Sequence, residues 1–230
     1  MKNKKVIKNI CIVRLSAIGD VCHTLAVVRA IQSHSPNTKI TWIIGKVESS
    51  LVEDIDDIEF IVLDKSNNFS SYKKIYQQLS SRKFDVALLM HASLRANIIS
   101  LMIKSSSRIG YDFQRARDLQ WLLSNKKIHT AGKHVLDTML DFIQPLGMTT
   151  HTKRWDIPLS EESLSFAENY SYDKAPTVII SPCSSDRYLN YRNWSVENFQ
   201  IIIKFLIEKY DCKVILTGGG SKNEKLYGKR

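Results

Sequence analysis

The sequence predicts an α/β fold of parallel strands, and three observations lead to this prediction. Short apolar runs, typical of buried strands, alternate with segments whose apolar residues recur at helical spacing. The run at 84–90 is almost continuously apolar, as expected for a parallel strand that is covered on both faces. The strand–turn–helix pattern restarts after an irregular stretch at 151–158 and a short helix, which indicates a second domain with its boundary near 158–175.

The elements follow one another in a regular order. The first strand is predicted at 6–13, and a helix with one apolar face follows it to about His34. Further strands are predicted at 39–44, 60–63, 84–90, 108–111, 177–180 and 213–216. Further helices are predicted at 48–56, 72–79, 94–103, 119–123, 135–144, from 159 onward, and at 195–210. Pro145 and Gly147 should end the helix at 135–144, and the alternation implies right-handed βαβ units.

The chain divides into two predicted domains. We place the first at 1–160 and the second at 176–230, joined by a linker at 161–175. The second domain has two predicted strands, whereas a doubly wound sheet usually has about five or six. We therefore expect this domain to be incomplete, with an open sheet edge.

The composition is that of a globular protein that can bury a core, with 43% hydrophobic and 24% charged residues. No apolar run approaches the roughly 18 residues that a membrane-spanning helix needs. The apolar run behind the basic N-terminus is interrupted by Lys8, Asn9 and Arg14. We therefore expect the first strand of a cytoplasmic protein there, and no signal peptide.

The cysteines and histidines do not form a metal-binding pattern. The four cysteines lie far apart without a Cys-x-x-Cys pair, which disfavours a zinc site and a disulfide scaffold. Cys11 and Cys22 are expected to be small buried hydrophobes. His129 and His134 come near a metal-ligand spacing, but no third ligand lies close to them in sequence.

The net charge of +10 favours a negatively charged partner. Nucleic acid, an anionic lipid surface and a phosphorylated saccharide all fit this charge. The basic residues are scattered apart from the termini and 104–117, and the sequence contains no recognised nucleic-acid module.

The most informative segment is RLSAIGDVCHT at 14–24, a turn from the first strand into the first helix. Ligands of open α/β sheets bind at this end of the strands. Asp20 is either placed there for chemistry or serves as the N-cap of the helix, and Gly19 lets a ligand approach the backbone. His23, three residues later, lies either near the cleft or in packing. The turn has no Gly-x-Gly-x-x-Gly and no Gly-Lys-Ser/Thr, which argues against dinucleotide-binding and P-loop sites.

The segment 12–25 resembles the N-terminal signature of the bacterial lipopolysaccharide heptosyltransferases, glycosyltransferase family 9. Further resemblances follow in the same order at 108–119, 181–194 and 214–219. The resemblance implies a GT-B-like fold, in which two Rossmann-like parallel-sheet domains face a cleft. It also implies inverting transfer of heptose from ADP-heptose to the lipopolysaccharide inner core, either Kdo–lipid A or its heptosylated form.

The resemblance also implies roles for particular residues. Asp20 matches the catalytic aspartate, which would take the proton of the acceptor hydroxyl. Arg192 would neutralise the departing ADP, so neither a metal nor another cofactor is expected. The expected donor-binding residues are Ser184, Ser185, Arg192, Thr217 and Gly218. The expected acceptor-binding residues are Ser16, Gly19, Arg117, Arg95 and Lys65.

Plainer interpretations remain beside these roles. Arg192, Arg117, Arg95 and Lys65 are also explained as solvated surface cations, and Thr217 as the end of a strand. An inactive truncated remnant that binds only acceptor is one alternative function, and a basic nucleic-acid-binding α/β protein is another. The expected partners of the enzyme are an ADP-sugar, an anionic lipopolysaccharide precursor and the cytoplasmic face of the inner membrane, with no nucleic acid. The heptose position and the exact sugar stay open.

Overall fold

The structure, a computed structural model, describes residues 6–66, 68–129, 133–149, 153–170, 175–184, 193–219 and 224–225. The chain forms two compact units, Met1–Pro158 and Leu159–Arg230. The boundary falls just before the segment predicted as a linker. That segment includes helix α6, Glu161–Glu168.

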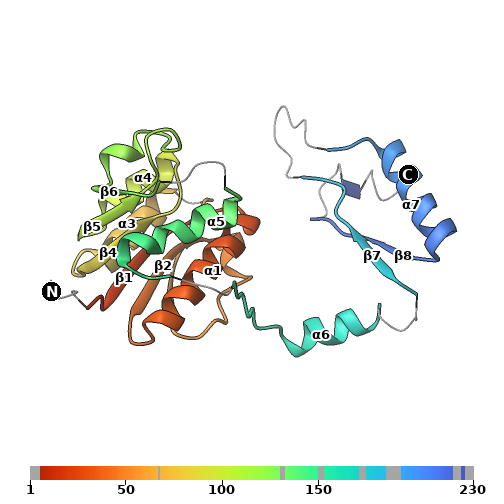
Figure 1. The fold of residues 1–230 in the computed structure, drawn as a ribbon, viewed down its shortest axis with the longest axis horizontal. Coiled ribbons are helices and arrows are strands. Elements are labelled where there is room, and N and C mark those ends of the chain that lie inside the picture. The colour runs from red at the N-terminus through yellow and green to blue at the C-terminus, as the bar shows by residue number, and fades with distance from the viewer. Residues whose placement is uncertain are drawn as a thin grey trace. The chain divides into compact units, whose positions relative to one another are not determined.

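The first unit is a six-stranded parallel sheet between two layers of helices (Figure 1). Its strands are β1 (Asn9–Val13), β2 (Lys39–Gly45), β3 (Ile58–Leu63), β4 (Phe84–Leu89), β5 (Ser105–Gly110) and β6 (Lys126–Lys127). The strand order is β3-β2-β1-β4-β5-β6, so the chain builds outward from β1 and then returns to its other side. The topological switch point therefore lies between β1 and β4, where open α/β sheets bind ligands.

Helices cover both faces of this sheet. They are α1 (Ile18–His34), α2 (Lys46–Ser49), α3 (Asn68–Leu79), α4 (Leu94–Leu101) and α5 (Val135–Leu140), with 3-10 helices η1 (Gln120–Leu122) and η2 (Asp141–Leu146). One core cluster contains Ile10 and Ile12 with residues of α1 and η2, and the other contains Cys11 and Val13 with residues of α3 and α4. Alternate residues of β1 thus enter opposite cores, because successive side chains of a strand point to opposite faces.

The second unit contains α6, β7 (Thr177–Ile180), α7 (Val196–Tyr210) and β8 (Lys213–Leu216). Strands β7 and β8 pair in parallel, with Thr177 opposite Lys213. Ser160 and Ser195 cap α6 and α7, since each hydroxyl accepts a hydrogen bond from the backbone N–H three residues later. These strands and α7 match the predicted ranges.

Three sequence predictions about elements, and one about a cysteine, need correction. The helix at 48–56 is only the single turn α2 followed by turns, and 119–123 is the 3-10 helix η1. The helix at 135–144 changes from α5 to the tighter η2, which contains Pro145 and ends at Gly147 with φ 71°. Proline has no N–H to donate to an α-helical hydrogen bond, which explains the change. Cys22 is half-buried, whereas Cys11 is fully buried as predicted.

Asp20 is not the N-cap of α1. Ala17 occupies that position, and Asp20 is the third residue of the helix. Its carboxylate still lies in the first turn, where the helix dipole favours negative charge. Among the described residues, no helix combines the length and the apolar character needed to cross a bilayer.

Candidate active site

The turn between β1 and α1 places the predicted catalytic carboxylate at the carboxyl end of a central strand. Asp20 Oδ2 forms an ion pair with Arg14 Nη2 and accepts a hydrogen bond from Ala17 N at 3.3 Å. Among the residues that the structure describes, no hydrogen bond or ion pair uses the other oxygen, Oδ1. That oxygen is therefore available to the hydroxyl of a ligand.

Arg14 is held by the strands on either side of β1. Its side chain is 9% exposed, and Nη1 donates to the carbonyl of Met90, just past β4, at 2.6 Å. Its backbone N–H donates to the carbonyl of Ile43 at 3.1 Å, and its carbonyl accepts from Trp42 Nε1 at 3.2 Å. Because both neighbouring strands fix Arg14, the guanidinium in turn holds the carboxylate of Asp20 in place.

His91 lies beside this ion pair, after the end of β4. Its Nδ1 accepts a hydrogen bond from the backbone N–H of Leu15 at 3.2 Å. Burial lowers the pKa of His91 to about 4, with the positive charge of Arg14 acting in the same direction and Asp20 opposing it. His91 is therefore neutral near pH 7, and its accepting Nδ1 assigns the proton to Nε2.

A buried carboxylate lies near the same turn, on the side of β2. Glu48 is buried on α2, and Lys65 Nζ lies 3.3 Å from its Oε1. A Cβ on Gly45 would lie 2.3 Å from Glu48 Oε2 and 2.4 Å from the carbonyl oxygen of Leu15. Only glycine therefore fits at this point, where β2 passes the turn.

Tyr111 completes the network from β5. Its hydroxyl donates to the carbonyl of Met90 at 3.1 Å, so this carbonyl accepts from both Tyr111 and Arg14. Burial raises the pKa of Tyr111 to about 12, which keeps the hydroxyl protonated as a donor. Gln120 Nε2 donates to the carbonyl of His91 at 3.1 Å and ties η1 to the same edge.

The predicted acceptor residues have different surroundings. Ser16 is half-buried in the turn, and Gly19 is exposed, with no described atom within 4 Å of the position of a Cβ. Lys65 is already paired with Glu48. The side chains of half-buried Arg95 and exposed Arg117 form no ion pair with another described residue.

His23 packs against a second histidine one turn after Asp20. Its ring lies 5.9 Å from that of His134, edge to face, and its buried Nδ1 has no hydrogen-bond partner among the described residues. His134 is the N-cap of α5, and its Nδ1 accepts from the N–H of Leu136 at 3.2 Å. Of the two possibilities for His23, the structure thus shows the packing contact.

Polar side chains also meet at the carboxyl ends of β7 and β8 in the second unit. The hydroxyls of Ser181 and Thr217 are 2.6 Å apart. Asn193 Oδ1 accepts hydrogen bonds from the N–H of Ser184 at 2.8 Å and from its hydroxyl at 3.0 Å. Two of the predicted donor-binding residues therefore lie at neighbouring strand ends.

The glycine turn after β8 is closed by an acidic residue. Glu224 Oε1 accepts a hydrogen bond from the N–H of Gly219 at 2.9 Å, and a Cβ on Gly218 would lie 3.4 Å from the same carboxylate. The predicted residues Ser185 and Arg192 lie outside the described residues.

Comparison with known proteins identifies the family of this chain. The profile of glycosyltransferase family 9 (heptosyltransferase) matches residues 72–229, more than half of the chain. The chain belongs to glycosyltransferase family 9. It is 35% identical over 218 residues to the lipopolysaccharide core heptosyltransferase OpsX of Haemophilus influenzae. The alignment covers 94% of this chain but 62% of that protein, so the chain spans less than two thirds of its relative's length.

Solved structures of family 9 share the fold. A family 9 glycosyltransferase from Veillonella parvula matches with a TM-score of 0.75 and 18% identity, over 97% of this chain and 66% of that chain. Escherichia coli heptosyltransferase WaaC with ADP-2-deoxy-2-fluoro heptose matches with a TM-score of 0.69 and 18% identity, over 96% of this chain and 72% of that chain. The predicted GT-B-like α/β fold class is confirmed by these matches.

Arg14, which pairs with Asp20 in this family 9 chain, and the residues near this pair were not predicted as site residues. Arg14 lies in the segment that resembles the family signature, so its position was visible in the sequence. Glu48 and His91 each lie just after a predicted strand, which is the signal that could have indicated them. Tyr111 ends the predicted strand at 108–111, but nothing in the sequence shows that it reaches Met90.

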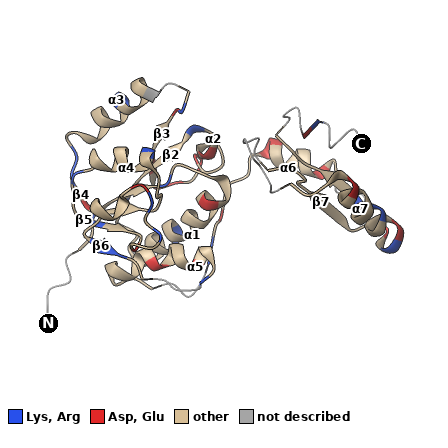
Figure 2. Ribbon diagram, turned by 90° about the horizontal axis from the view of Figure 1, so that it is seen from above, with Lys and Arg blue, Asp and Glu red and all other residues tan. Residues whose placement is uncertain are grey.

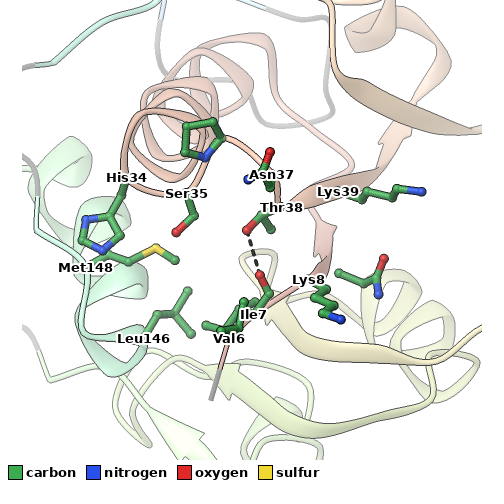
Figure 3. A pocket seen from close by; sticks show the side chains of 12 residues that line it. Val6, Ile7, Lys8, His34, Ser35, Asn37, Thr38, Lys39, Leu146 and Met148 are labelled. Atoms are coloured by element: carbon green, nitrogen blue, oxygen red, sulfur yellow. Dashed lines mark hydrogen bonds between the residues drawn. The ribbon is translucent and has the colours of Figure 1, made fainter. Parts of the chain in front are cut away.

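A hollow of about 720 Å³ lies at the opposite edge of the sheet, at the amino ends of β1 and β2 (Figure 3). Leu146, Met148 and His34 lie on one side of it, and Thr38 donates to the carbonyl of Ile7 at 2.9 Å on the other. The residues around Asp20 are at the carboxyl ends of the strands, so this hollow is not part of the candidate active site.

Proposed function

We propose that this chain acts in the transfer of heptose from ADP-heptose to the inner core of lipopolysaccharide, with inversion at the anomeric carbon. The observation that carries the proposal is the Arg14–Asp20 ion pair at the carboxyl end of β1, in a chain that belongs to glycosyltransferase family 9. The solved complexes of Escherichia coli WaaC with ADP and with ADP-2-deoxy-2-fluoro heptose support an ADP-sugar donor. The name of the Haemophilus influenzae relative supports a lipopolysaccharide core acceptor.

The proposed reaction is a single displacement. The acceptor oxygen forms a bond to the anomeric carbon, while the bond from that carbon to the β-phosphate oxygen breaks. Asp20 accepts the proton of the acceptor hydroxyl on Oδ1, which the described protein leaves unpaired. Attack from the face opposite the leaving group inverts the configuration.

Arg14 is the positioning residue for this base. Its guanidinium occupies Oδ2 and is itself anchored to the carbonyl of Met90. The base can act only on a hydroxyl that lies against Oδ1, so the rate depends on holding the acceptor hydroxyl there in the correct geometry.

The departing ADP develops negative charge on its β-phosphate. Arg192 is the proposed cation at this group, and no metal ion is expected there because arginine binds phosphate oxygens in a bidentate manner. The proposed donor contacts also include Ser184, Ser185, Thr217 and Gly218. Thr217 directly follows β8, and Ser184 lies in the segment after β7, the strand that pairs with β8, which supports this assignment.

The proposed acceptor is anionic and meets cations beside the turn. Of the three predicted cations, Arg95 and Arg117 are the better candidates for binding the acceptor, because Glu48 already compensates the charge of Lys65. Ser16, half-buried in the turn, and exposed Gly19, with open space beside it, are the other proposed acceptor contacts. A nucleotide-sugar donor favours a cytoplasmic location, which we include in the proposal.

An ADP-release assay with ADP-heptose and heptose-deficient lipopolysaccharide tests this function. We expect acceptor-dependent release that Asp20→Asn reduces by about a hundredfold or more, as expected for loss of a general base. Asp137→Asn is the matched control, since Asp137 is also the third residue of a helix and is ion-paired, with Lys153 at 2.6 Å. It should retain activity.

Absence of release from a chain that still unfolds cooperatively would overturn the proposal. Binding of the acceptor without ADP release would then favour the inactive remnant. Equal losses of ADP release in Asp20→Asn and Asp137→Asn would show that Asp20 is only a structural residue at the start of a helix.

A further inference from the structure

Helix α4 exposes an apolar stripe on the side that faces away from the sheet. Leu94, Ile98 and Leu101 are 64%, 40% and 68% exposed and recur at i, i+4 and i+7. The opposite side of the helix, with Ala96 and Ile99, is buried in the core. A surface helix is normally polar on its outer face, so an apolar outer stripe indicates an interaction surface.

The segment after β5 extends this stripe. The N–H of Leu94 donates to Asp118 Oδ2 at 2.8 Å, and Asn97 Nδ2 donates to the carbonyl of Asp118. At the other end of α4, Arg108 donates to the carbonyls of Ser100 and Leu123, at 2.8 and 2.6 Å. Residues 118–123 are therefore fixed alongside α4.

This arrangement adds exposed side chains next to the helix. Leu119 and Leu122 are 62% and 61% exposed, and Phe113 is 68% exposed with its ring against Trp121 at 5.6 Å. We name the set Leu94, Ile98, Leu101, Phe113, Leu119 and Leu122 the α4–η1 patch. Aromatic and leucine side chains of this kind are typical of surfaces that enter the interfacial region of a bilayer.

The patch lies in a basic part of the first unit. Residues 94–127 contain seven Lys and Arg but only two Asp, at 112 and 118. Asp118 accepts a hydrogen bond from the first N–H of α4, and Asp112 pairs with Arg115 at 3.2 Å. The segment that carries the patch therefore also carries exposed cations, among them Arg117 and the two lysines of β6. Figure 2 shows β6 in the blue of Lys and Arg.

We propose that the α4–η1 patch docks this protein on the surface of an anionic lipid bilayer. The apolar side chains would enter the interface while the flanking lysines and arginines bind lipid phosphates. A second copy of the chain is a poorer occupant, because it would bring the same positive charge to the contact.

The proposal deepens the proposed function. It rests on that function in one respect, because a lipid-linked acceptor gives the protein its reason to bind a bilayer. Leu94 follows β4 and Leu119 follows β5, so one end of the patch lies at the carboxyl edge of the sheet, as Asp20 does. A bilayer bound there would present a lipid-linked acceptor beside the candidate active site. The binding experiment needs neither donor nor acceptor, so its failure is distinct from failure of the transferase assay.

Flotation of the purified chain with vesicles tests the docking surface. Vesicles of phosphatidylglycerol and phosphatidylethanolamine should bind the chain, and neutral phosphatidylcholine vesicles should bind it at least about tenfold more weakly. The triple variant Ile98→Ser/Leu101→Ser/Leu122→Ser should lower partition into the anionic vesicles by about tenfold or more. The matched control is Val47→Ser/Val62→Ser/Val135→Ser, which replaces three exposed apolar residues elsewhere on the same unit and should bind like the wild type.

Trp121 provides a second measurement. Its fluorescence should shift to shorter wavelength on addition of anionic vesicles, and Trp121→Phe should remove this shift. Equal binding of the two serine triples, equal binding to neutral vesicles, or no binding by the wild type would overturn the proposal. A wild-type dimer that the patch variant converts to a monomer, without vesicle binding, would assign the patch to a second copy of the chain.

Discussion

Arg14 and Asp20 form an ion pair across the turn from β1 into α1, with the arginine side chain 9% exposed and the aspartate 35% exposed. The arginine is anchored to the carbonyl of Met90, 76 residues away in sequence. The position of the proposed base is therefore set from β4 as well as from its own helix.

Arg14→Met should destabilise the protein and abolish activity. It removes charged hydrogen bonds to Met90 and Asp20, so we expect a loss of about 1.5–3 kcal/mol in the free energy of unfolding, measured in urea. Arg82→Met is the control, because Arg82 pairs with Glu59 at the surface and exposed pairs contribute less than about 1 kcal/mol. Normal stability and activity of Arg14→Met would show that the pair does not hold the base.

His91 should make stability depend on pH in the acidic range. Its pKa is lowered from 6.5 to about 4, so between these values the unfolded chain binds a proton that the folded chain does not. The free energy of unfolding should rise with pH across this window and fall on acidification, by up to about 3 kcal/mol in total.

The His91→Asn variant should flatten this pH dependence in urea titrations. His34→Asn replaces an exposed histidine and should leave the slope unchanged. An identical slope in all three proteins would contradict the assignment to His91.

Two glycines near the site should respond in opposite ways to alanine. Gly45→Ala places a Cβ against the carbonyl of Leu15 and the carboxylate of Glu48, so it should cost about 2 kcal/mol of stability. Gly19→Ala meets open space and should change stability by less than about 0.5 kcal/mol. If Gly19 borders the acceptor, its variant should instead raise the KM for the acceptor. Equal stability of the two variants in thermal unfolding would contradict the close approach at Gly45.

Cys11 should be protected from thiol reagents in the folded protein. Burial raises its pKa well above the usual range, and the side chain is fully enclosed between the sheet and α3 and α4. The other cysteines are half-buried. Titration of the folded protein with an aromatic disulfide should show one slowly reacting thiol, and the Cys11→Ala variant should lack this slow phase. In urea, all four cysteines should react rapidly. Rapid native reaction at Cys11 would contradict the packing of β1.

Secondary structure was predictable wherever local pattern and burial agree. Strands β1 to β4, β7 and β8 are apolar runs, and the helices α1 and α7 show helical periodicity; the structure confirms these elements. Strand β6 was missed because its two lysines carry no apolar signal, and it pairs only through the backbone of β5. Residues 135–144 follow a helical pattern up to Pro145. The chain nevertheless tightens to a 3-10 helix from Asp141 onward, ahead of the proline.

The site was predictable only where one segment holds the chemistry. Asp20 lies in a local turn between a strand and a helix, so its place at the sheet edge follows from position alone. Its role as an N-cap was wrong, because the helix begins at Ile18 and not after Asp20. Nothing local shows which cation pairs with it, since that depends on how the turn folds back over β1.

By itself, the sequence determined the alternation of strands and helices, the second unit and the carboxylate after the first strand, because each is encoded in neighbouring residues. Only the tertiary structure decided that Arg14 and Tyr111 share the carbonyl of Met90 and that His91 supports the turn at Leu15. The physical reason is the strand order, which places β4 beside β1 and β5 beside β4. A parallel sheet brings strand ends together from distant parts of the chain, and this register leaves no mark in any single segment.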